Sequence, residues 1–321
     1  MAIIRISVSL IVCLLWGGVG LFIAWPFTVD DAYISFRYAQ HLADGLGLTW
    51  NPGYRVEGYT NFLWTVLMAV PESSHFSVVL FAKLVGCTSL VALAFLLFLF
   101  SKKQGGGPMA RWGAPILLLL SPATYFHAVS GLETMMYSLE VFALFVLVFE
   151  CAESRCQWRA SAIALPLVAL TAALTRPEGV LTGSLAYCAA LLFCGSDRRR
   201  YLLASGGVAL VLSVGYMAWR VHYFGWLLPN TAYVKLGICG ASIRAFNDAI
   251  RGMVVLGVLA FFSWNHSRRR IFALGWSMVL VIVVPNLATR PIMDFAERYF
   301  LHSAHPGSDF RRISVARYRL G

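Results

Sequence analysis

Charged side chains are scarce in this sequence. Only 13% of the 321 residues are Asp, Glu, Lys or Arg, while 59% are hydrophobic, and the mean hydropathy is +0.71. Soluble domains carry about 25% charged residues. The composition therefore excludes a water-soluble domain and predicts an all-α polytopic transmembrane helical bundle.

Several kinds of reactive grouping are also missing. The seven cysteines show neither repeated pairing nor metal-type spacing, which argues against a disulfide framework and a structural zinc site. No Ser/His/Asp or Cys/His grouping indicates a covalent intermediate. The net charge of +11 comes from short basic clusters between apolar runs, so membrane topology explains it and nucleic acid is not an expected partner.

Apolar runs close to the length of a membrane span recur along the chain, and we expect about nine spans. The first run is too long for a signal peptide and has no small-residue cleavage site, so it is expected to be a retained helix. The expected spans are residues 3–26, 77–100, 112–126, 135–151, 160–175, 180–194, 201–222, 251–264 and 271–287. One or two of them are short enough to be broken or re-entrant.

Basic residues follow every even-numbered run. Short loops rich in Lys and Arg stay in the cytoplasm, so the pattern predicts a multi-pass protein of the plasma (inner) membrane with a cytoplasmic N-terminus. The polar residues of the alternate loops then face away from the cytoplasm. The basic residues are Lys102, Lys103, Arg111, Arg155, Arg159, Arg198, Arg199, Arg200, Arg268, Arg269 and Arg270.

The only long loop, residues 27–76, is the first outer loop, and long ordered loops are commonly functional. Its first half predicts a surface helix from Asp30, as N-cap, to Gly45. Its second half, TNFLWTVLMAV, predicts another interfacial helix. Simple interfacial anchoring is the competing explanation for the aromatic residues Tyr33, Phe62 and Trp64.

The adjacent Asp30 and Asp31 have two interpretations. A carboxylate held within reach of a hydroxyl acts as a general base, and a neighbouring group tunes its affinity for the proton. Alternatively, Asp30 caps the helix and Asp31 favours the positive end of its dipole.

Between the two expected helices, the segment NPGYRVEGYTN carries turn signals at Asn51 and the residues after it. Arg55 has two interpretations. Its guanidinium offers paired donors to a phosphate, or it forms an ion pair with Glu57.

The segment from Asp30 to Trp64 resembles the first outer loop of GT-C class membrane glycosyltransferases. The resemblance is closest to the terminal arabinofuranosyltransferases of mycobacterial cell walls and their bacterial relatives. Three later motifs are similar to the same group: GLET at 131–134, RPEG at 176–179 and LPNTAYVK at 228–235.

The resemblance implies transfer of a sugar from a polyprenyl-phosphate donor to an extracytoplasmic glycan, lipid or protein acceptor, with inversion. It implies that Asp30 is the catalytic base and that Asp31 positions it or the acceptor. Membrane lipids are further expected partners. No cofactor is indicated, and the sequence does not decide whether a divalent metal takes part. The substrate-binding residues implied by the resemblance are Arg37, Asn51, Arg55, Glu57, Tyr59, Thr60, Asn61, Glu133, Arg176, Glu178, Asn230 and Lys235.

Local explanations compete for some of these residues. Arg176 could pair with Glu178 beside a helix end, Lys235 could extend to the membrane surface, and Glu133 could favour a helix N-terminus. Arg37 could bind ordinary lipid headgroups.

Relatives in this family continue with more helices and often an outer domain. We therefore expect residues 1–298 to form the transmembrane domain and residues 299–321 to be a polar, basic tail of a truncated or frame-shifted product, with a short natural terminus as the alternative. The alternative functions are a lipid or glycolipid transporter or flippase, and an inactive truncated membrane scaffold. A transporter should carry partnered charges within its spans, where this sequence has mainly Lys83 and Glu140.

Overall fold

The computed structural model describes residues 15–74, 76–105, 107–152, 158–227 and 229–230. Within these residues the fold is all-helical, as the sequence predicts. The first described helix is Leu15–Ala24. The others are α2 (Ala32–Ala43), α3 (Phe62–Ser73), α4 (Val78–Lys103), α5 (Pro108–Leu120), α6 (Pro122–Val129), α7 (Thr134–Ala152), α8 (Trp158–Thr175), α9 (Glu178–Phe193) and α10 (Ser196–Phe224).

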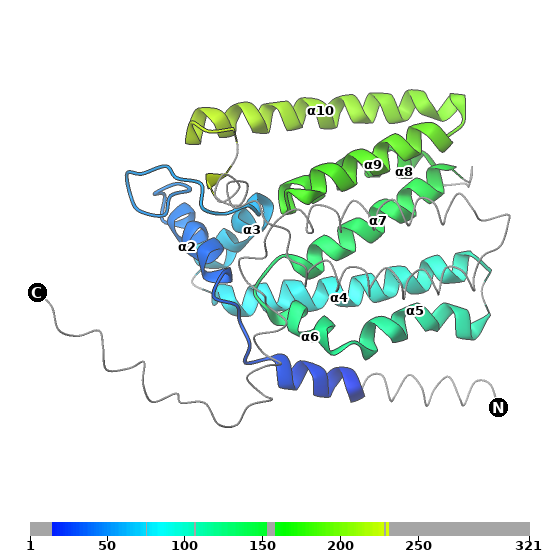
Figure 1. Ribbon diagram of the computed structural model, residues 1–321, viewed down its shortest axis with the longest axis horizontal. Coiled ribbons are helices and arrows are strands. Elements are labelled where there is room, and N and C mark those ends of the chain that lie inside the picture. The colour runs from blue at the N-terminus through cyan, green and yellow to red at the C-terminus, as the bar shows by residue number, and fades with distance from the viewer. Residues whose placement is uncertain (1–14, 75, 106, 153–157, 228, 231–321) are drawn as a thin grey trace, which may run out of the picture.

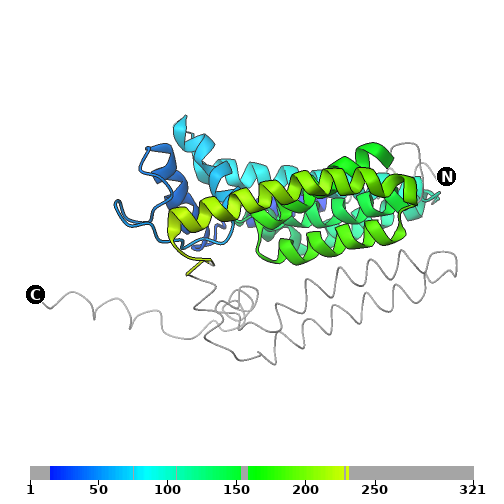
Figure 2. The same cartoon turned by 90° about the horizontal axis from the view of Figure 1, so that it is seen from above.

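The longer helices run side by side along the long axis of the molecule. Figure 1 shows α4, α5, α7, α9 and α10 aligned in this way, with α2 and α3 at the end where α4 and α7 begin and α10 finishes. Figure 2 shows the same arrangement from above. The first outer loop therefore covers one end of a helical bundle.

Among the described residues, three helices are long and apolar enough to cross a bilayer, or four if the bent pair Arg111–Leu120 and Pro122–Val129 forms one span: Val78–Lys103, Thr134–Ala152 and Arg198–Phe224. In the most apolar stretch of the last of these, only 6% of the residues are buried within the described protein, so its apolar surface suits contact with lipid. The chain is thus a membrane protein. The spans expected over 77–100, 135–151, 160–175, 180–194 and 201–222 correspond to α4, α7, α8, α9 and α10, whereas those over 251–264 and 271–287 lie outside the described residues.

The span expected over residues 112–126, one of the runs short enough to be broken, is broken in the structure. The chain bends by 71° between Arg111–Leu120 and Pro122–Val129. Ser121 is extended, with ψ at 117°, because the residue before a proline is disfavoured in the helical region. The bend produces the short helix α6, which lies beside the end of the bundle that α2 and α3 cover (Figure 1).

The prediction that Asp30 is the N-cap is wrong, because α2 begins two residues later, at Ala32. The N-cap is Asp31, and its side chain forms no capping hydrogen bond. The first free amides of the helix, those of Ala32, Tyr33 and Ile34, donate instead to the backbone oxygens of Val29, Asp30 and Asp31 at 3.0–3.2 Å. The helix start therefore does not require either carboxylate as a cap. The end agrees better with expectation, because Gly45 follows α2 with φ at +75°.

The two ends of the bundle carry different side chains. Lys103, at the end of α4, forms an ion pair with Glu150 of α7. At the start of α10, Arg198 Nη1 donates to the backbone oxygen of Cys151 at 2.7 Å. The basic residues at the end of α4 and at the start of α10 thus lie at the end opposite to α2 and α3 (Figure 1), and this separation agrees with the charge pattern of the sequence.

Small residues allow α8 and α9 to approach closely. A Cβ atom on Gly179 would lie 1.9 Å from the backbone oxygen of Ala172, and one on Gly183 would lie 2.9 Å from Ala169 Cβ. Glycines spaced by four residues commonly form such helix contacts in membranes. Because Gly179 ends the RPEG motif, this contact fixes the position of Arg176.

We predict that Gly179→Ala lowers stability because the added methyl group must push α8 and α9 apart. The expected cost is about 1–3 kcal/mol, measured as a lower Tm of the protein in detergent. Gly207→Ala in α10 is the matched control, since a Cβ there meets nothing within 4 Å. Equal Tm values for the two variants would contradict this account of the contact.

Candidate functional site

Polar side chains from four segments meet at the end of the bundle beneath α2 and α3. Asn61, just before α3, is central to this network and only 7% exposed. Its Nδ2 donates to Glu133 Oε2 at 2.7 Å. Its Oδ1 accepts from Ser35 Oγ of α2 at 3.0 Å and from Thr65 Oγ1 of α3 at 3.2 Å. The outer loop is thereby joined to the GLET motif.

Arg176 joins the RPEG motif to the same network. Its Nη1 donates to Glu133 Oε1 at 2.9 Å, and its Nε donates to Glu178 Oε2 at 3.3 Å. Burial alone would lower the pKa of Arg176, but the carboxylates of Glu133 and Glu178 outweigh this effect and raise the pKa above its ordinary value. The guanidinium therefore remains charged. The local pairing of Arg176 with Glu178 occurs, but it is only part of a larger arrangement.

The GLET motif also packs against the start of α2. Gly131 has φ at +83°, and an added Cβ would lie 2.9 Å from Ala32 Cβ. Its backbone oxygen accepts from Trp64 Nε1 at 3.1 Å, and the neighbouring Ser130 oxygen accepts from Val29 N at 2.9 Å. The acidic pair thus follows directly after Val29, which is bonded to the residue that precedes this motif.

A second buried ion pair joins the loop to α10. Arg220 donates from Nε to both Glu57 oxygens, at 3.0 and 2.9 Å, and from Nη2 to Oε2 at 2.8 Å. The local pairing of Glu57 with Arg55 is therefore wrong. The Arg55 guanidinium lies instead 4.5 Å from the ring centroid of Tyr223.

Sequence reasoning missed Arg220 because it lies within an apparent membrane span. A signal was present, since an arginine near the end of an apolar run is costly and commonly functional. Its partner lies 163 residues away in the sequence, so no local spacing indicates the pair.

Two tyrosines surround the Glu57 segment. Tyr38 of α2 donates to the Val56 oxygen at 2.6 Å and accepts from Gly58 N at 3.0 Å. Burial raises the pKa of Tyr38 and of Tyr59, so both phenols stay protonated. Tyr59 packs against Tyr38 and Phe224, at ring-centroid distances of 4.8 and 6.3 Å.

The acidic pair lies on the outer side of this framework, where Asp30 is exposed and Asp31 is half-buried. Among the described residues, the Asp30 carboxylate has no hydrogen-bond or ion-pair partner. Arg37, which lies further along α2, is also exposed. It donates from Nε to the Trp50 oxygen at 2.9 Å, and its guanidinium lies 5.0 Å from the Trp50 ring centroid.

The remaining expected site residues are distributed around the same loop. Asn51 is exposed and forms an isolated antiparallel β-bridge with Tyr54. Thr60 is half-buried next to Asn61. The backbone nitrogen of Asn230 donates to the backbone oxygen of Glu57 at 3.1 Å. Lys235 lies outside the described residues. The structure thus joins Asn61, Glu133, Arg176 and Glu178 in one network, and Glu57 with the Asn230 backbone in another.

Lys83 and Glu140, the main charges expected inside spans, each contact another segment of the described protein. Lys83 Nζ donates to the Trp25 oxygen and lies 5.4 Å from the Trp25 ring centroid. Glu140 Oε1 accepts from Thr175 Oγ1 at 3.1 Å. Neither contact joins the two charges into a pathway through the bundle.

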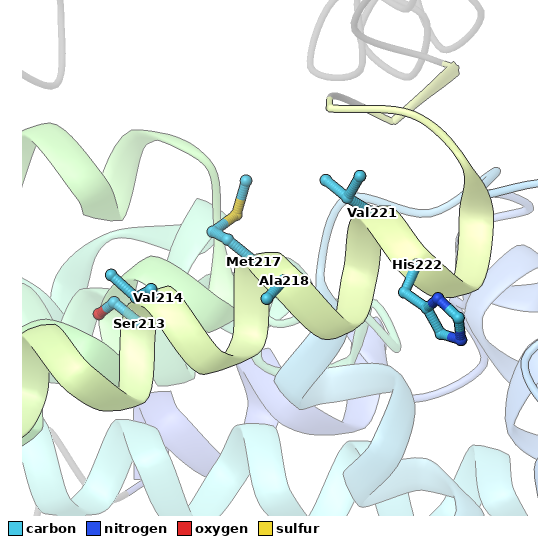
Figure 3. Close-up of a pocket in the computed structure, with 6 residues that line it drawn as sticks. All are labelled: Ser213, Val214, Met217, Ala218, Val221 and His222. Atoms are coloured by element: carbon cyan, nitrogen blue, oxygen red, sulfur yellow. The ribbon is translucent and has the colours of Figure 1, made fainter.

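No group of three or more metal-ligating side chains occurs among the described residues. A shallow hollow lies along the exposed side of α10, and Figure 3 shows the side chains that line it. They are Ser213, Val214, Met217, Ala218, Val221 and His222. None of these is an expected site residue, and the surface is mostly apolar.

The chain matches two curated proteins, each a "terminal beta-(1->2)-arabinofuranosyltransferase". It is 30% identical over 218 residues to the protein of Mycobacterium tuberculosis, a match covering 64% of this chain and 34% of the relative. The chain is similar in sequence to terminal arabinofuranosyltransferases. It is 27% identical over 241 residues to the protein of Corynebacterium glutamicum, covering 67% of this chain and 35% of the relative.

These matches confirm the resemblance read from the motifs. The chain spans about a third of the length of the arabinofuranosyltransferases that it matches. It matches no protein-family model and no solved structure.

We predict that Asn61→Asp destabilises the protein at neutral pH, because a second carboxylate would replace the amide that donates to Glu133. Repulsion within the new carboxyl pair raises the pKa of one member in the folded state. The lost stability, about 1–3 kcal/mol for the unsatisfied buried group, is therefore recovered as pH falls and that carboxyl becomes protonated. The measurement is Tm against pH.

Asn51→Asp is the control for Asn61→Asp, since Asn51 is exposed on the same loop. Its Tm should follow that of the unmodified protein throughout the pH range. An Asn61→Asp variant with the same profile would show that the contact with Glu133 does not hold the loop.

Proposed function

We propose that this chain is the membrane part of a glycosyltransferase that transfers an arabinofuranosyl group from a polyprenyl-phosphate donor to an extracytoplasmic glycan or lipid acceptor. The observation that carries the proposal is the similarity to two arabinofuranosyltransferases. The convergence of the GLET and RPEG motifs with Asn61 of the first loop supports it. The proposed location is the inner membrane, with the N-terminus in the cytoplasm and α2 and α3 on the outer side.

In the proposed reaction, Asp30 accepts the proton of an acceptor hydroxyl. The hydroxyl oxygen forms a bond to the anomeric carbon, and the bond between that carbon and the phosphate oxygen breaks with inversion. The leaving polyprenyl phosphate keeps the electron pair, so negative charge accumulates on it and nearby fixed cations stabilise it. The exposure of Asp30 suits this role.

The proposed substrate contacts divide by exposure. Arg37, Asn51 and Arg55 are exposed, and the guanidinium groups of Arg37 and Arg55 lie over aromatic rings, so these residues are proposed to meet the donor phosphate or the acceptor. Glu133 and Asn61 are buried and bonded within the protein. We propose that these two serve the substrate by holding Arg176 and the loop in place.

We predict that Asp30→Asn lowers the rate of arabinofuranosyl transfer about 10²- to 10⁴-fold, because the amide cannot accept the proton in the transition state. The measurement is the initial rate with a radiolabelled polyprenyl-phosphate donor in membranes containing the protein. Asp44→Asn is the matched control, because Asp44 is an exposed aspartate at the other end of α2.

The Asp44→Asn variant should keep the unmodified rate. Both variants should reach the same level in the membrane, since the Asp30 carboxylate has no hydrogen-bond or ion-pair partner among the described residues. An Asp30→Asn variant that turns over normally would remove Asp30 as the base.

A further inference from the structure

Arg220 occupies an unusual place for a charged residue. It lies in α10, a helix whose surface is largely open to lipid, yet only 6% of its own surface is exposed. Isolating a guanidinium from water is costly unless its donors are satisfied. Nε and Nη2 donate to Glu57, and Nη1 donates to the Leu227 oxygen at 2.8 Å. The side chain thus contacts both the first outer loop and the chain that follows α10.

Glu57 is held from two directions. Its carboxylate, only 4% exposed, binds Arg220. Its backbone oxygen accepts from Asn230 N at 3.1 Å, within the LPNTAYVK segment. The residues before and after it, Val56 and Gly58, are both bonded to the phenol of Tyr38.

Tyr38 is part of α2, so these contacts connect α10 to the helix that follows the acidic pair. Arg220 binds Glu57, and the neighbours of Glu57 are bonded to Tyr38. Tyr38 belongs to α2, which begins directly after Asp31. A helix transmits such a constraint well because its backbone is held by regular hydrogen bonds. A second contact reinforces it, since Tyr223 accepts from Leu48 N at 3.0 Å.

We infer that Arg220 is a positioning residue for the acidic pair: its fork to Glu57 fixes loop residues 56–58 against α10 and, through Tyr38, sets the place of α2. Its role in catalysis rests on the proposed function of Asp30. The guanidinium shape matters as well as the charge, because a lysine ammonium cannot make the paired bonds to Glu57 and the bond to Leu227 together.

The test compares Arg220→Lys with Arg199→Lys, which makes the same substitution at an exposed residue near the other end of α10. Arg220→Lys should lower kcat for arabinofuranosyl transfer about tenfold, with less than about threefold change in donor KM, since the loss of one well-placed charged hydrogen bond has this size. Arg199→Lys should leave both constants unchanged. A purely structural role would lower the folded fraction and leave kcat of the folded protein unchanged, which would overturn the inference.

Tyr38→Phe tests the connection itself, because it removes the hydroxyl bonded to residues 56 and 58 and keeps the ring. It should reproduce the fall in kcat, and the double variant with Arg220→Lys should be no slower than the slower single variant, since both changes break one connection. Effects that multiply would mean that the two residues act separately, and the proposed connection would be wrong.

Hydrogen exchange separates this inference from the proposed function. The amides of residues 46–60 should exchange faster in Arg220→Lys than in Arg199→Lys, whether or not the protein transfers sugar. Faster exchange in a chain with no transferase activity would sink the proposed function and leave Arg220 as the residue that holds the loop. Unchanged exchange would overturn the role of Arg220.

Discussion

A carboxylate removed from water needs a cation or several hydrogen-bond donors, and this requirement determines how the first outer loop meets the helical bundle. Glu133 is satisfied by Arg176 and Asn61, which belong to different segments of the chain. Glu57 is satisfied by Arg220, from a third. If the loop moved away, the Glu57–Arg220 pair would leave a buried, unpaired charge and the hydrogen bond from Asn61 to Glu133 would be lost, so these two contacts together fix the loop on the end of the bundle.

This arrangement separates buried supporting residues from the exposed residues for which a role in catalysis is proposed. The buried residues Asn61, Glu133 and Glu57 bond to protein groups, whereas Asp30, Arg37 and Arg55 lie on the outer surface. A reaction at a lipid phosphate needs a carboxylate and cations held at fixed places, because their reorganisation would add to the barrier. The two ion pairs and the close contact of α8 with α9 at Gly179 supply that rigidity.

Much of the fold could be predicted from the sequence because the apolar runs of α4, α7, α8, α9 and α10 reflect the bilayer directly. The meeting of GLET, RPEG and Asn61 was implied by the resemblance, although no local pattern shows which atoms bond. The pairing of Glu57 with Arg220 was not predicted, since contacts between distant segments depend on the packed bundle. The sequence allowed one or two broken spans among the short runs without indicating which, although Pro122 is a signal for the bend at Ser121. At the start of α2, the first amides donate to backbone oxygens. The N-cap prediction was based on side-chain preference, which does not indicate such backbone hydrogen bonds.

The central claim is that this end of the bundle carries out chemistry on a lipid-linked sugar and does not simply move the lipid across the membrane. The most direct measurement supplies the detergent-solubilised protein with a labelled polyprenyl-phosphate arabinofuranose and a glycan acceptor, and quantifies free polyprenyl phosphate. The account predicts release of the lipid phosphate in equal amount to the sugar transferred. An intact donor after incubation with correctly folded protein would contradict it, because a flippase leaves the bond between sugar and phosphate unbroken.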